Sequence, residues 1–317
     1  AYFAPLIHQK FGTNAGYCDV HTARTPWSAT DYDARAPGAG KFRTAFESYG
    51  RLLLNESTAH DGPVFSEGRV HWLYAGLVDG NYAQIVSDAP FREPPLVDFD
   101  LLKIHPLETD FGMGSPDMFY TGGADWTQPR DFHSPWFDRF IASTIAFGHI
   151  GYLTGEWGLE GTLKSYFLVK ALQEAYAGVE VDRIAYERAG RMLTTSQAVR
   201  SGAYRDGHVY VRYANDLEVW VNLGWEERPW EVEHQGERYV LPATGWLAAM
   251  GGDLLAYSAL PEGGRVEYVQ CGDYCYLDAR EARYRAPAIG AKGAVVIKRG
   301  EGGSWWLIPA TQAEEVT

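Results

Sequence analysis

The stretches AGYCDV (residues 15–20) and GKFRTAFESYGRLLLNESTAHDGPVFSEG (residues 40–68) decide the fold class of this chain. The first is a compact run ending in polar residues, and residues 62–68 are bounded by glycines, so both predict short buried strands. Between them, the apolar residues of 40–55 recur every three or four positions, which predicts a helix: Phe42, Phe46, Tyr49 and Leu53. This order of strand, helix and strand is a β-α-β unit.

The chain changes character near residue 180. Before it, we predict further helices over 70–85, 136–147 and 163–176 and a strand over 95–104. After it, the pattern alternates with period two and predicts hairpins, one around Asn215-Asp216 and one across residues 300–303. We therefore expect α/β plus all-β: residues 1–180 a partial, catalytic (β/α) barrel of TIM type, and residues 181–317 a C-terminal antiparallel β-sandwich.

Composition limits the classes of partner. With 28 Lys and Arg against 41 Asp and Glu, the net charge is -13, so the surface would repel a nucleic acid backbone. The sequence contains no run of 18 apolar residues, so we do not expect a membrane-spanning helix. Three cysteines (Cys18, Cys271 and Cys275) are too few for a disulfide scaffold; Cys271 and Cys275 could bridge a turn in an oxidising compartment. The compartment stays open, with extracellular and periplasmic locations among the options.

Two carboxylates end consecutive predicted strands. Asp19 lies at the end of residues 15–20 and Glu67 near the end of residues 62–68. Catalytic groups of (β/α) barrels lie at the carboxyl ends of strands. Neighbouring strands lie about 4.8 Å apart, close to the carboxylate separation of roughly 5–5.5 Å in retaining glycosidases. This predicts a nucleophile and an acid/base, although such carboxylates also cap helices.

Other polar and aromatic residues near the predicted strand ends are candidates for substrate binding: Tyr17, His21, Trp27, Asp98, Asp100 and His105. An aromatic ring can stack on the C–H face of a pyranose. Asp98 and Asp100 share one strand face by period two. We expect a carbohydrate substrate, with no metal and no organic cofactor.

A metal site is the competing interpretation. Asp19 and His21 would offer two ligand types on one strand face, and His60 and Asp61 precede Glu67. The histidines are otherwise scattered, and the sequence contains no HExxH, G-x-S-x-G or Gly-rich nucleotide-binding motif.

Three segments resemble a known family: residues 16–22, residues 53–68 and residues 140–153, followed by a β-domain. They look like the C-terminal half of a glycoside hydrolase of the α-N-acetylgalactosaminidase and endo-α-N-acetylgalactosaminidase type, in the wider α-amylase and α-galactosidase group. The resemblance covers residues 10–220. It implies a retaining enzyme that acts on an α-linked sugar, with Asp19 as nucleophile and Glu67 as acid/base.

One departure from the family affects the expected partners. Family members have three or four βα units ahead of the nucleophile, whereas eighteen residues precede Asp19. We therefore expect a homo-oligomer or a missing N-terminal barrel segment. Two alternatives remain open: a non-catalytic carbohydrate-binding or assembly protein derived from a glycosidase barrel, and a metallohydrolase that uses Asp19 and His21.

Overall fold

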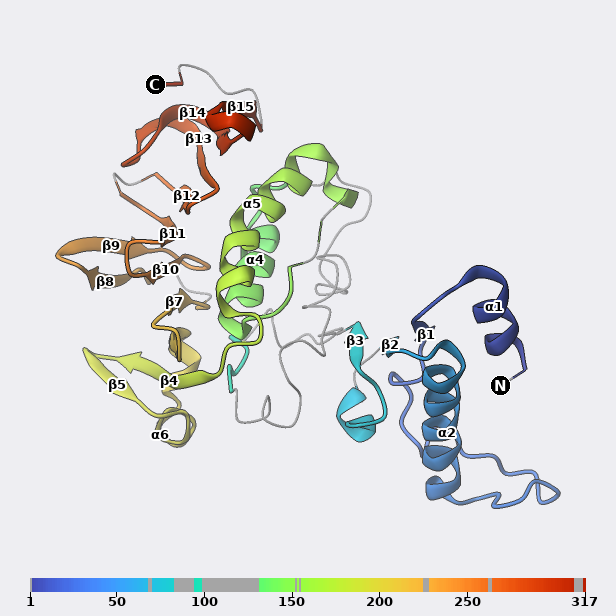
Figure 1. The fold of residues 1–317 in the computed structure, drawn as a ribbon. Coiled ribbons are helices and arrows are strands. Elements are labelled where there is room, and N and C mark those ends of the chain that lie inside the picture. The colour runs from blue at the N-terminus through green and yellow to red at the C-terminus, as the bar shows by residue number, and fades with distance from the viewer. Residues whose placement is uncertain are drawn as a thin grey trace.

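The computed structural model describes residues 2–67, 70–82, 94–98, 131–151, 153, 155–224, 228–261, 264–310 and 316–317. Its elements gather around two principal sheets (Figure 1), one with three strands near the N-terminus and one with ten strands in the C-terminal half. The three-stranded sheet has its own hydrophobic cluster, and the ten-stranded sheet has one on each face.

The smaller sheet is parallel, in the order β1 (Gly16–Cys18), β2 (Val64–Glu67), β3 (Gly80–Tyr82). Three helical elements accompany it: α1 (Phe3–Phe11), α2 (Phe42–His60) and the 3-10 turn η1 (His71–Tyr74). Because α2 connects two parallel strands, the predicted β-α-β unit is confirmed.

The apolar stripe of α2 packs as its spacing predicts. Leu53 is fully buried with Val64 of β2, and Phe46 stacks on Tyr74 with ring centroids 5.4 Å apart. The helix ends at His60. The next residue, Asp61, has a φ of +49°, in the left-handed region, so its backbone cannot continue the helix.

The predicted helix over 70–85 is wrong. Residues 71–74 form only η1, and residues 80–82 form β3. Gly76 has a φ of +78°, which breaks helical geometry, and the Asp79 carboxylate accepts a hydrogen bond from Val64 N at 2.8 Å. These local turns bring the chain back beside β2 before a second full turn of helix can form.

The larger sheet is antiparallel, in the order β15-β14-β13-β12-β11-β10-β7-β6-β4-β5. Its strands are β4 (Val181–Arg188), β5 (Arg191–Leu193), β6 (His208–Tyr213), β7 (Glu218–Asn222), β10 (Trp246–Met250), β11 (Leu254–Ala259), β12 (Val266–Gln270), β13 (Tyr274–Arg285), β14 (Gly290–Arg299) and β15 (Trp305–Pro309). A separate hairpin consists of β8 (Trp230–His234) and β9 (Glu237–Leu241). Short helical elements lie in the connections: α6 (Thr195–Ser201), η6 (Ala203–Asp206) and η7 (Glu301–Gly303).

Two faces of the larger sheet bury different partners. α4 (Pro135–Phe147) and α5 (Gly158–Tyr176), the latter preceded by η5 (Gly155–Trp157), lie along one face (Figure 1). The β8–β9 hairpin packs on the other face. Along β11, Ala256 belongs to the cluster on the helix side and Tyr257 to the cluster on the hairpin side, as period two requires.

The fold is therefore mixed, with helices and a large antiparallel sheet, and the expected antiparallel strands are confirmed. The expected sandwich is not confirmed, because helices cover one face of the ten-stranded sheet and a two-stranded hairpin packs on the other. A partial barrel is not shown either, since the described parallel strands number three. The helices predicted over 136–147 and 163–176 are confirmed as α4 and α5, and they share a core with the sheet beyond residue 180.

Both predicted hairpins are confirmed. β6 pairs with β7 through a turn in which Asp216 has a φ of +63°, and β14 pairs with β15. Asn215 fixes the first turn, because its side chain accepts from Leu217 N at 3.3 Å and donates to Ala175 O at 2.8 Å. The strand predicted over 95–104 falls mostly outside the described residues; residues 95–98 are described and are not in a strand.

The three cysteines are free thiols, so the structure contains no bridge between Cys271 and Cys275. Burial, followed by the charge of Glu56, raises the pKa of Cys18 to about 11. This thiol is therefore protonated at neutral pH and is a poor nucleophile.

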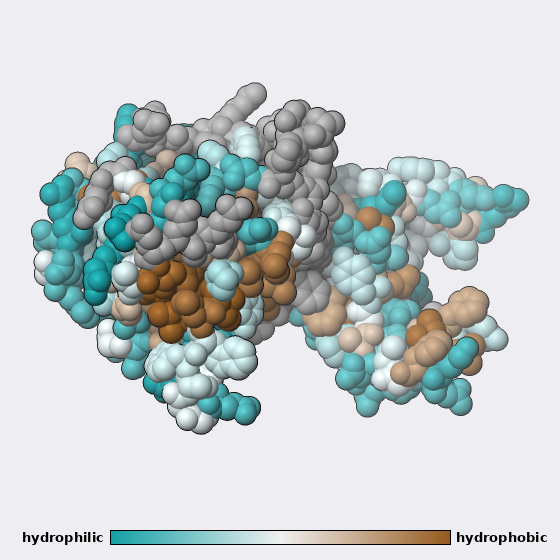
Figure 2. Space-filling view, turned by 90° about the horizontal axis from the view of Figure 1, so that it is seen from above, coloured by the Kyte–Doolittle hydropathy of each residue, from teal (hydrophilic) through white to brown (hydrophobic). Residues whose placement is uncertain are grey.

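Apolar side chains also reach the surface. In the view of Figure 2, hydrophobic atoms gather in a compact patch on the unit with the large sheet. On α1 the exposed large hydrophobic residues are Phe3, Leu6, Ile7 and Phe11. Among the described residues, no helix combines the length and hydropathy needed to span a membrane.

Candidate functional site

The carboxyl ends of β1 and β2 bring Asp19 and Glu67 to one edge of the three-stranded sheet. Cys18 and Ser66 are register partners in these parallel strands, and the two acidic residues each come one position later. Parallel neighbours lie about 4.8 Å apart; Glu67 is the last residue of β2, and Asp19 is the first residue of the turn after β1. The Asp19 side chain is exposed and that of Glu67 is half-buried.

Glu67 lies on the face of the sheet that points away from α2. Cys18 is buried toward α2, whereas Tyr17, one position earlier, is 52 % exposed. Tyr17 and Phe65 are register partners, and Glu67 follows Phe65 by two positions, so all three share one face. This face is where a substrate could contact the Glu67 carboxylate.

Hydrogen bonds fasten the turn after β1 across the end of β2. Ser66 Oγ donates to Cys18 O at 2.6 Å, and Thr22 Oγ1 donates to Glu67 O at 2.6 Å. The backbone positions that carry Asp19 and Glu67 are thus held on either side by bonds between the two strand ends. A fixed backbone is what a pair of catalytic carboxylates needs to keep its separation.

Trp27 lies in the loop after β1 and is 54 % exposed. Its ring contacts Phe42, the first residue of α2, edge to face with centroids 6.5 Å apart. Trp27 is therefore an exposed aromatic group that lies against the N-terminal end of α2.

His21 is held against α2. Its Nδ1 lies 2.7 Å from Asp19 O, and its ring meets Tyr49 edge to face at 5.2 Å. A carbonyl oxygen only accepts, so Nδ1 carries the proton. Within the described part of the chain, Asp19 and His21 belong to no group of three metal-ligating atoms. The geometry lends no support to the metallohydrolase interpretation.

The remaining predicted site residues are not brought to this edge by any described contact. Asp98 follows Val97, whose backbone N and O both bond to the Tyr186 hydroxyl on β4, at 2.8 and 2.7 Å. Burial, with a smaller contribution from the Asp98 charge, raises the pKa of Tyr186. Asp100 and His105 lie outside the described residues.

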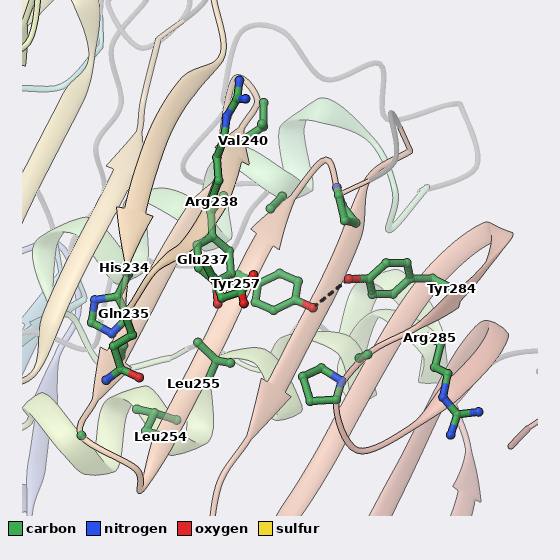
Figure 3. Close-up of a pocket in the computed structure, with 17 residues that line it drawn as sticks. His234, Gln235, Glu237, Arg238, Val240, Leu254, Leu255, Tyr257, Tyr284 and Arg285 are labelled. Carbon is green, nitrogen blue, oxygen red and sulfur yellow. Dashed lines mark hydrogen bonds between the residues drawn. The ribbon is translucent and has the colours of Figure 1, made fainter.

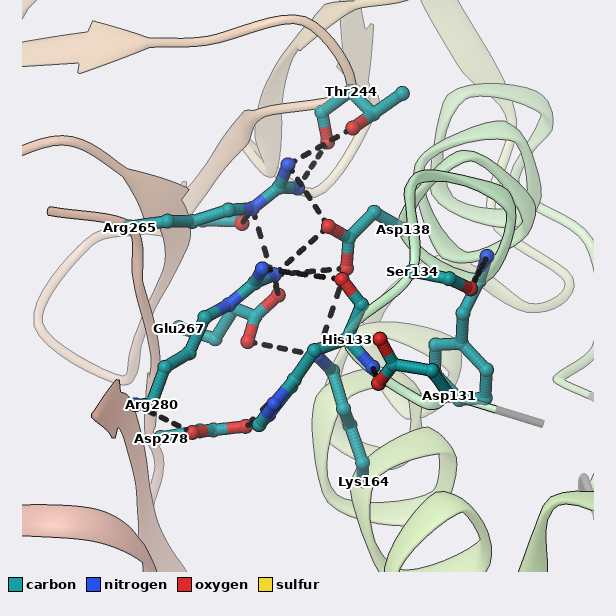
Figure 4. Close-up of polar contacts among 12 residues, drawn as sticks. Asp131, His133, Ser134, Asp138, Lys164, Thr244, Arg265, Glu267, Asp278 and Arg280 are labelled. Atoms are coloured by element: carbon teal, nitrogen blue, oxygen red, sulfur yellow. Dashed lines mark hydrogen bonds and ion pairs between the residues drawn. The ribbon is translucent and has the colours of Figure 1, made fainter. Parts of the chain in front are cut away.

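A second group of charged side chains lies between α4, α5 and the large sheet (Figure 4). We call it the buried charge cluster: Asp138, Lys164, Arg265, Glu267, Asp278 and Arg280, with His133 at its margin. Lys164, Asp138, Glu267 and Asp278 are each no more than 3 % exposed. Three carboxylates thus face one lysine and two arginine side chains between the helices and the sheet.

Lys164 is central to the buried charge cluster. Its Nζ lies 2.9 Å from Glu267, 3.5 Å from Asp138 and 3.9 Å from Asp278. Arg280 contacts Asp138 at 2.8 Å and Glu267 at 3.1 Å. Burial alone would raise the pKa of Glu267, but the charges of Lys164 and the two arginines lower it below the ordinary value. The cluster therefore joins α4 and α5 electrostatically to β12 and β13.

His133, Glu267 and Asp278 also form a possible set of metal ligands, with ligand atoms within 4.8 Å of one another. The ammonium of Lys164 already lies against two of these three residues. A divalent cation there would meet Lys164 and Arg280 at close range, so the residues do not fit a metal site.

Sequence reasoning missed the buried charge cluster, although one signal was present. Lys164 precedes Leu168, Leu172 and Tyr176 at spacing four, so it falls on the apolar face of its helix. A lysine on the apolar face of a helix is rarely buried unless a carboxylate pairs with it. The structure buries Lys164 among carboxylates.

Comparisons of this chain with protein-family models, with curated proteins and with solved structures give no match. The resemblance to glycoside hydrolases consequently rests on short sequence segments. The evidence for the roles of Asp19 and Glu67 is their position at the carboxyl ends of β1 and β2.

Proposed function

We propose that the protein is a retaining glycoside hydrolase that acts on an α-linked sugar. The observation that carries the proposal is the parallel register of β1 and β2, in which Cys18 opposes Ser66. It supports adjacent carboxylates at the carboxyl edge of the sheet, where barrel-type enzymes hold their catalytic groups.

In the proposed reaction, the Asp19 carboxylate attacks the anomeric carbon while Glu67, protonated, gives its proton to the departing glycosidic oxygen. The bond to the leaving group breaks as the ester bond to Asp19 forms. Glu67, now a carboxylate, takes a proton from water, and the resulting hydroxide displaces Asp19 from the sugar. No metal or organic cofactor takes part.

Surface aromatic groups fit a sugar substrate. Tyr17 is exposed on the Glu67 face and Trp27 is exposed in the loop after β1. Their rings can stack on the C–H face of a pyranose. Roles for His21, Asp98, Asp100 and His105 in binding the sugar hydroxyls remain predictions.

The experiment compares hydrolysis of aryl α-glycosides by the wild type, Asp19→Asn, Glu67→Gln and a control. Glu47→Gln is the matched control, because Glu47 is a surface carboxylate of α2 paired with Arg43. We expect losses on the order of 10³-fold or more for the two site variants and little change for the control. Sodium azide should partly restore Asp19→Asn by replacing the missing nucleophile.

Equal activity in all four proteins would refute the assignment of Asp19 and Glu67. Loss of activity on addition of a chelator would instead favour the metallohydrolase. Sugar binding without any hydrolysis by the wild type would favour the non-catalytic carbohydrate-binding alternative.

A further inference from the structure

A groove of about 810 Å³ lies on the hairpin side of the large sheet, opposite α4 and α5. β11 provides its floor, the β9 strand of the hairpin one wall, and the end of β13 the other wall. The residues on which the argument depends are Glu237, Arg238, Tyr239, Tyr257 and Tyr284.

Tyrosines dominate the aromatic part of this groove. Figure 3 shows the hydroxyls of Tyr257 and Tyr284 facing each other, and they lie 3.5 Å apart. Tyr257 is 4 % exposed and Tyr284 is only partly buried, so Tyr284 is the more accessible of the two to a ligand. The Tyr239 ring lies 5.5 Å from that of Tyr257 at 56°, which forms an aromatic corner.

The phenols of Tyr239 and Tyr257 are neutral at physiological pH. Burial raises the pKa of Tyr239, and burial followed by the hydrogen bond to Tyr284 raises that of Tyr257. A neutral phenol both donates and accepts a hydrogen bond. Such groups match hydroxyls, which also do both.

An irregularity in β13 builds the second wall. The pairing of β13 with β14 shifts register between Asp278 and Arg283, and Arg280 within this bulge has a φ of +53°. Bulges bend a strand and re-aim its side chains. Here Asp278 and Arg280 join the buried charge cluster on the helix side, while Tyr284 reaches the groove on the hairpin side.

The charges at the groove are of both signs. Its lining includes Glu237 and two arginines: Arg238, which is paired with Glu231, and the exposed Arg285. A phosphate or an acidic peptide would meet the Glu237 carboxylate as well as these guanidinium groups. Aromatic rings with mixed donors and acceptors favour a neutral ligand rich in hydroxyls.

We propose that this groove is a carbohydrate-binding site with no catalytic role, separate from the edge that carries Asp19 and Glu67. Tyr239 offers a ring for stacking, and the Tyr284 hydroxyl, which the Tyr257 hydroxyl contacts from behind, bonds to a sugar hydroxyl. The proposal does not depend on hydrolysis at the strand edge.

Affinity electrophoresis in native gels containing gastric mucin, galactomannan or soluble starch tests the proposal. We expect at least one polysaccharide to retard the wild type, and Tyr239→Ala to bind it about tenfold more weakly, which corresponds to about 1.4 kcal/mol. The double variant Tyr257→Phe/Tyr284→Phe keeps both rings and should also bind more weakly. Tyr32→Ala, at a 74 % exposed tyrosine outside the groove, is the control and should bind as the wild type does.

Absence of retardation by all three polysaccharides would overturn the proposal, as would equal retardation of wild type and groove variants. Thermal melting shows whether each variant is folded. If Tyr239→Ala is unfolded, the conservative double variant Tyr257→Phe/Tyr284→Phe takes its place in the binding test. Glu67→Gln should keep groove binding, and the groove variants should still hydrolyse aryl α-glycosides, so failure of this site and failure of the proposed enzyme give different results.

Discussion

Replacing Lys164 by methionine should strongly destabilise the fold. The ammonium is 1 % exposed and contacts three buried carboxylates at 2.9–3.9 Å, so its removal leaves one negative charge uncompensated in the interior. Breaking a buried ion pair from one side costs about 3–5 kcal/mol. For a unit of this size we expect the melting temperature to fall by roughly 6–20 °C.

The loss should depend on pH in a defined direction. In the wild type the pKa of Glu267 is lowered, so its contribution to stability is complete above the unfolded-state value of about 4.3 and is lost as the pH falls through the folded-state value. Without Lys164, Glu267 loses a major cause of that lowering and binds a proton more readily in the folded state. The difference in free energy of unfolding between wild type and Lys164→Met should therefore shrink as the pH falls from neutral toward the unfolded-state pKa.

Urea denaturation at several pH values measures this difference. Lys170→Met is the matched control on the same helix, because Lys170 pairs with Glu174 at 2.8 Å near the surface, where an ion pair contributes about 0–1 kcal/mol. Adding Glu267→Gln to Lys164→Met should recover part of the loss, since it removes the unpaired charge. Equal effects of Lys164→Met and Lys170→Met, or a difference that grows as the pH falls, would show that Lys164 does not stabilise the fold by pairing with these carboxylates.

Three further outcomes are expected. Thr194→Ala should lower the free energy of unfolding by about 1 kcal/mol, measured by urea titration, because Thr194 and Gln197 form the capping box of α6; an unchanged midpoint would contradict this. A chelator should leave hydrolysis of aryl α-glycosides unchanged, and inhibition reversed by a divalent metal would contradict the proposed mechanism. The wild type should self-associate in light scattering, and Phe3→Ser/Phe11→Ser should weaken association because both side chains are exposed on α1; a monomer at all concentrations would contradict this.

Local periodicity was enough to predict several helices and both hairpins, but not how the sheets are covered. The apolar spacing of Phe46 and Leu53 predicted the helix α2, which connects two parallel strands. The Asn215-Asp216 pair predicted the turn between β6 and β7. Both signals lie within a few residues of the structure that they specify. The helix expected over 70–85 failed because Gly76 adopts a left-handed conformation that the apolar pattern does not report.

Long-range arrangement could not be predicted in the same way. The buried charge cluster joins Asp138 to Glu267 and Arg280, residues more than a hundred positions apart, and alternation along β12 cannot say which carboxylate meets which cation. The groove likewise needs the bulge near Arg280 to bring Tyr284 over the sheet. For the candidate site, chain order predicted that Asp19 and Glu67 come at the ends of consecutive strands, and the structure pairs β1 with β2 in parallel, with Asp19 in the turn after β1.

The role of Asp19 as nucleophile is measured most directly by the mass of the protein after reaction with a 5-fluoro-α-glycosyl fluoride, a reagent whose glycosyl-enzyme ester hydrolyses slowly. We expect the addition of one glycosyl group, located by peptide mapping to the peptide that contains Asp19, and no addition in Asp19→Asn. Turnover of aryl α-glycosides without labelling at Asp19, or labelling at another carboxylate, would contradict it.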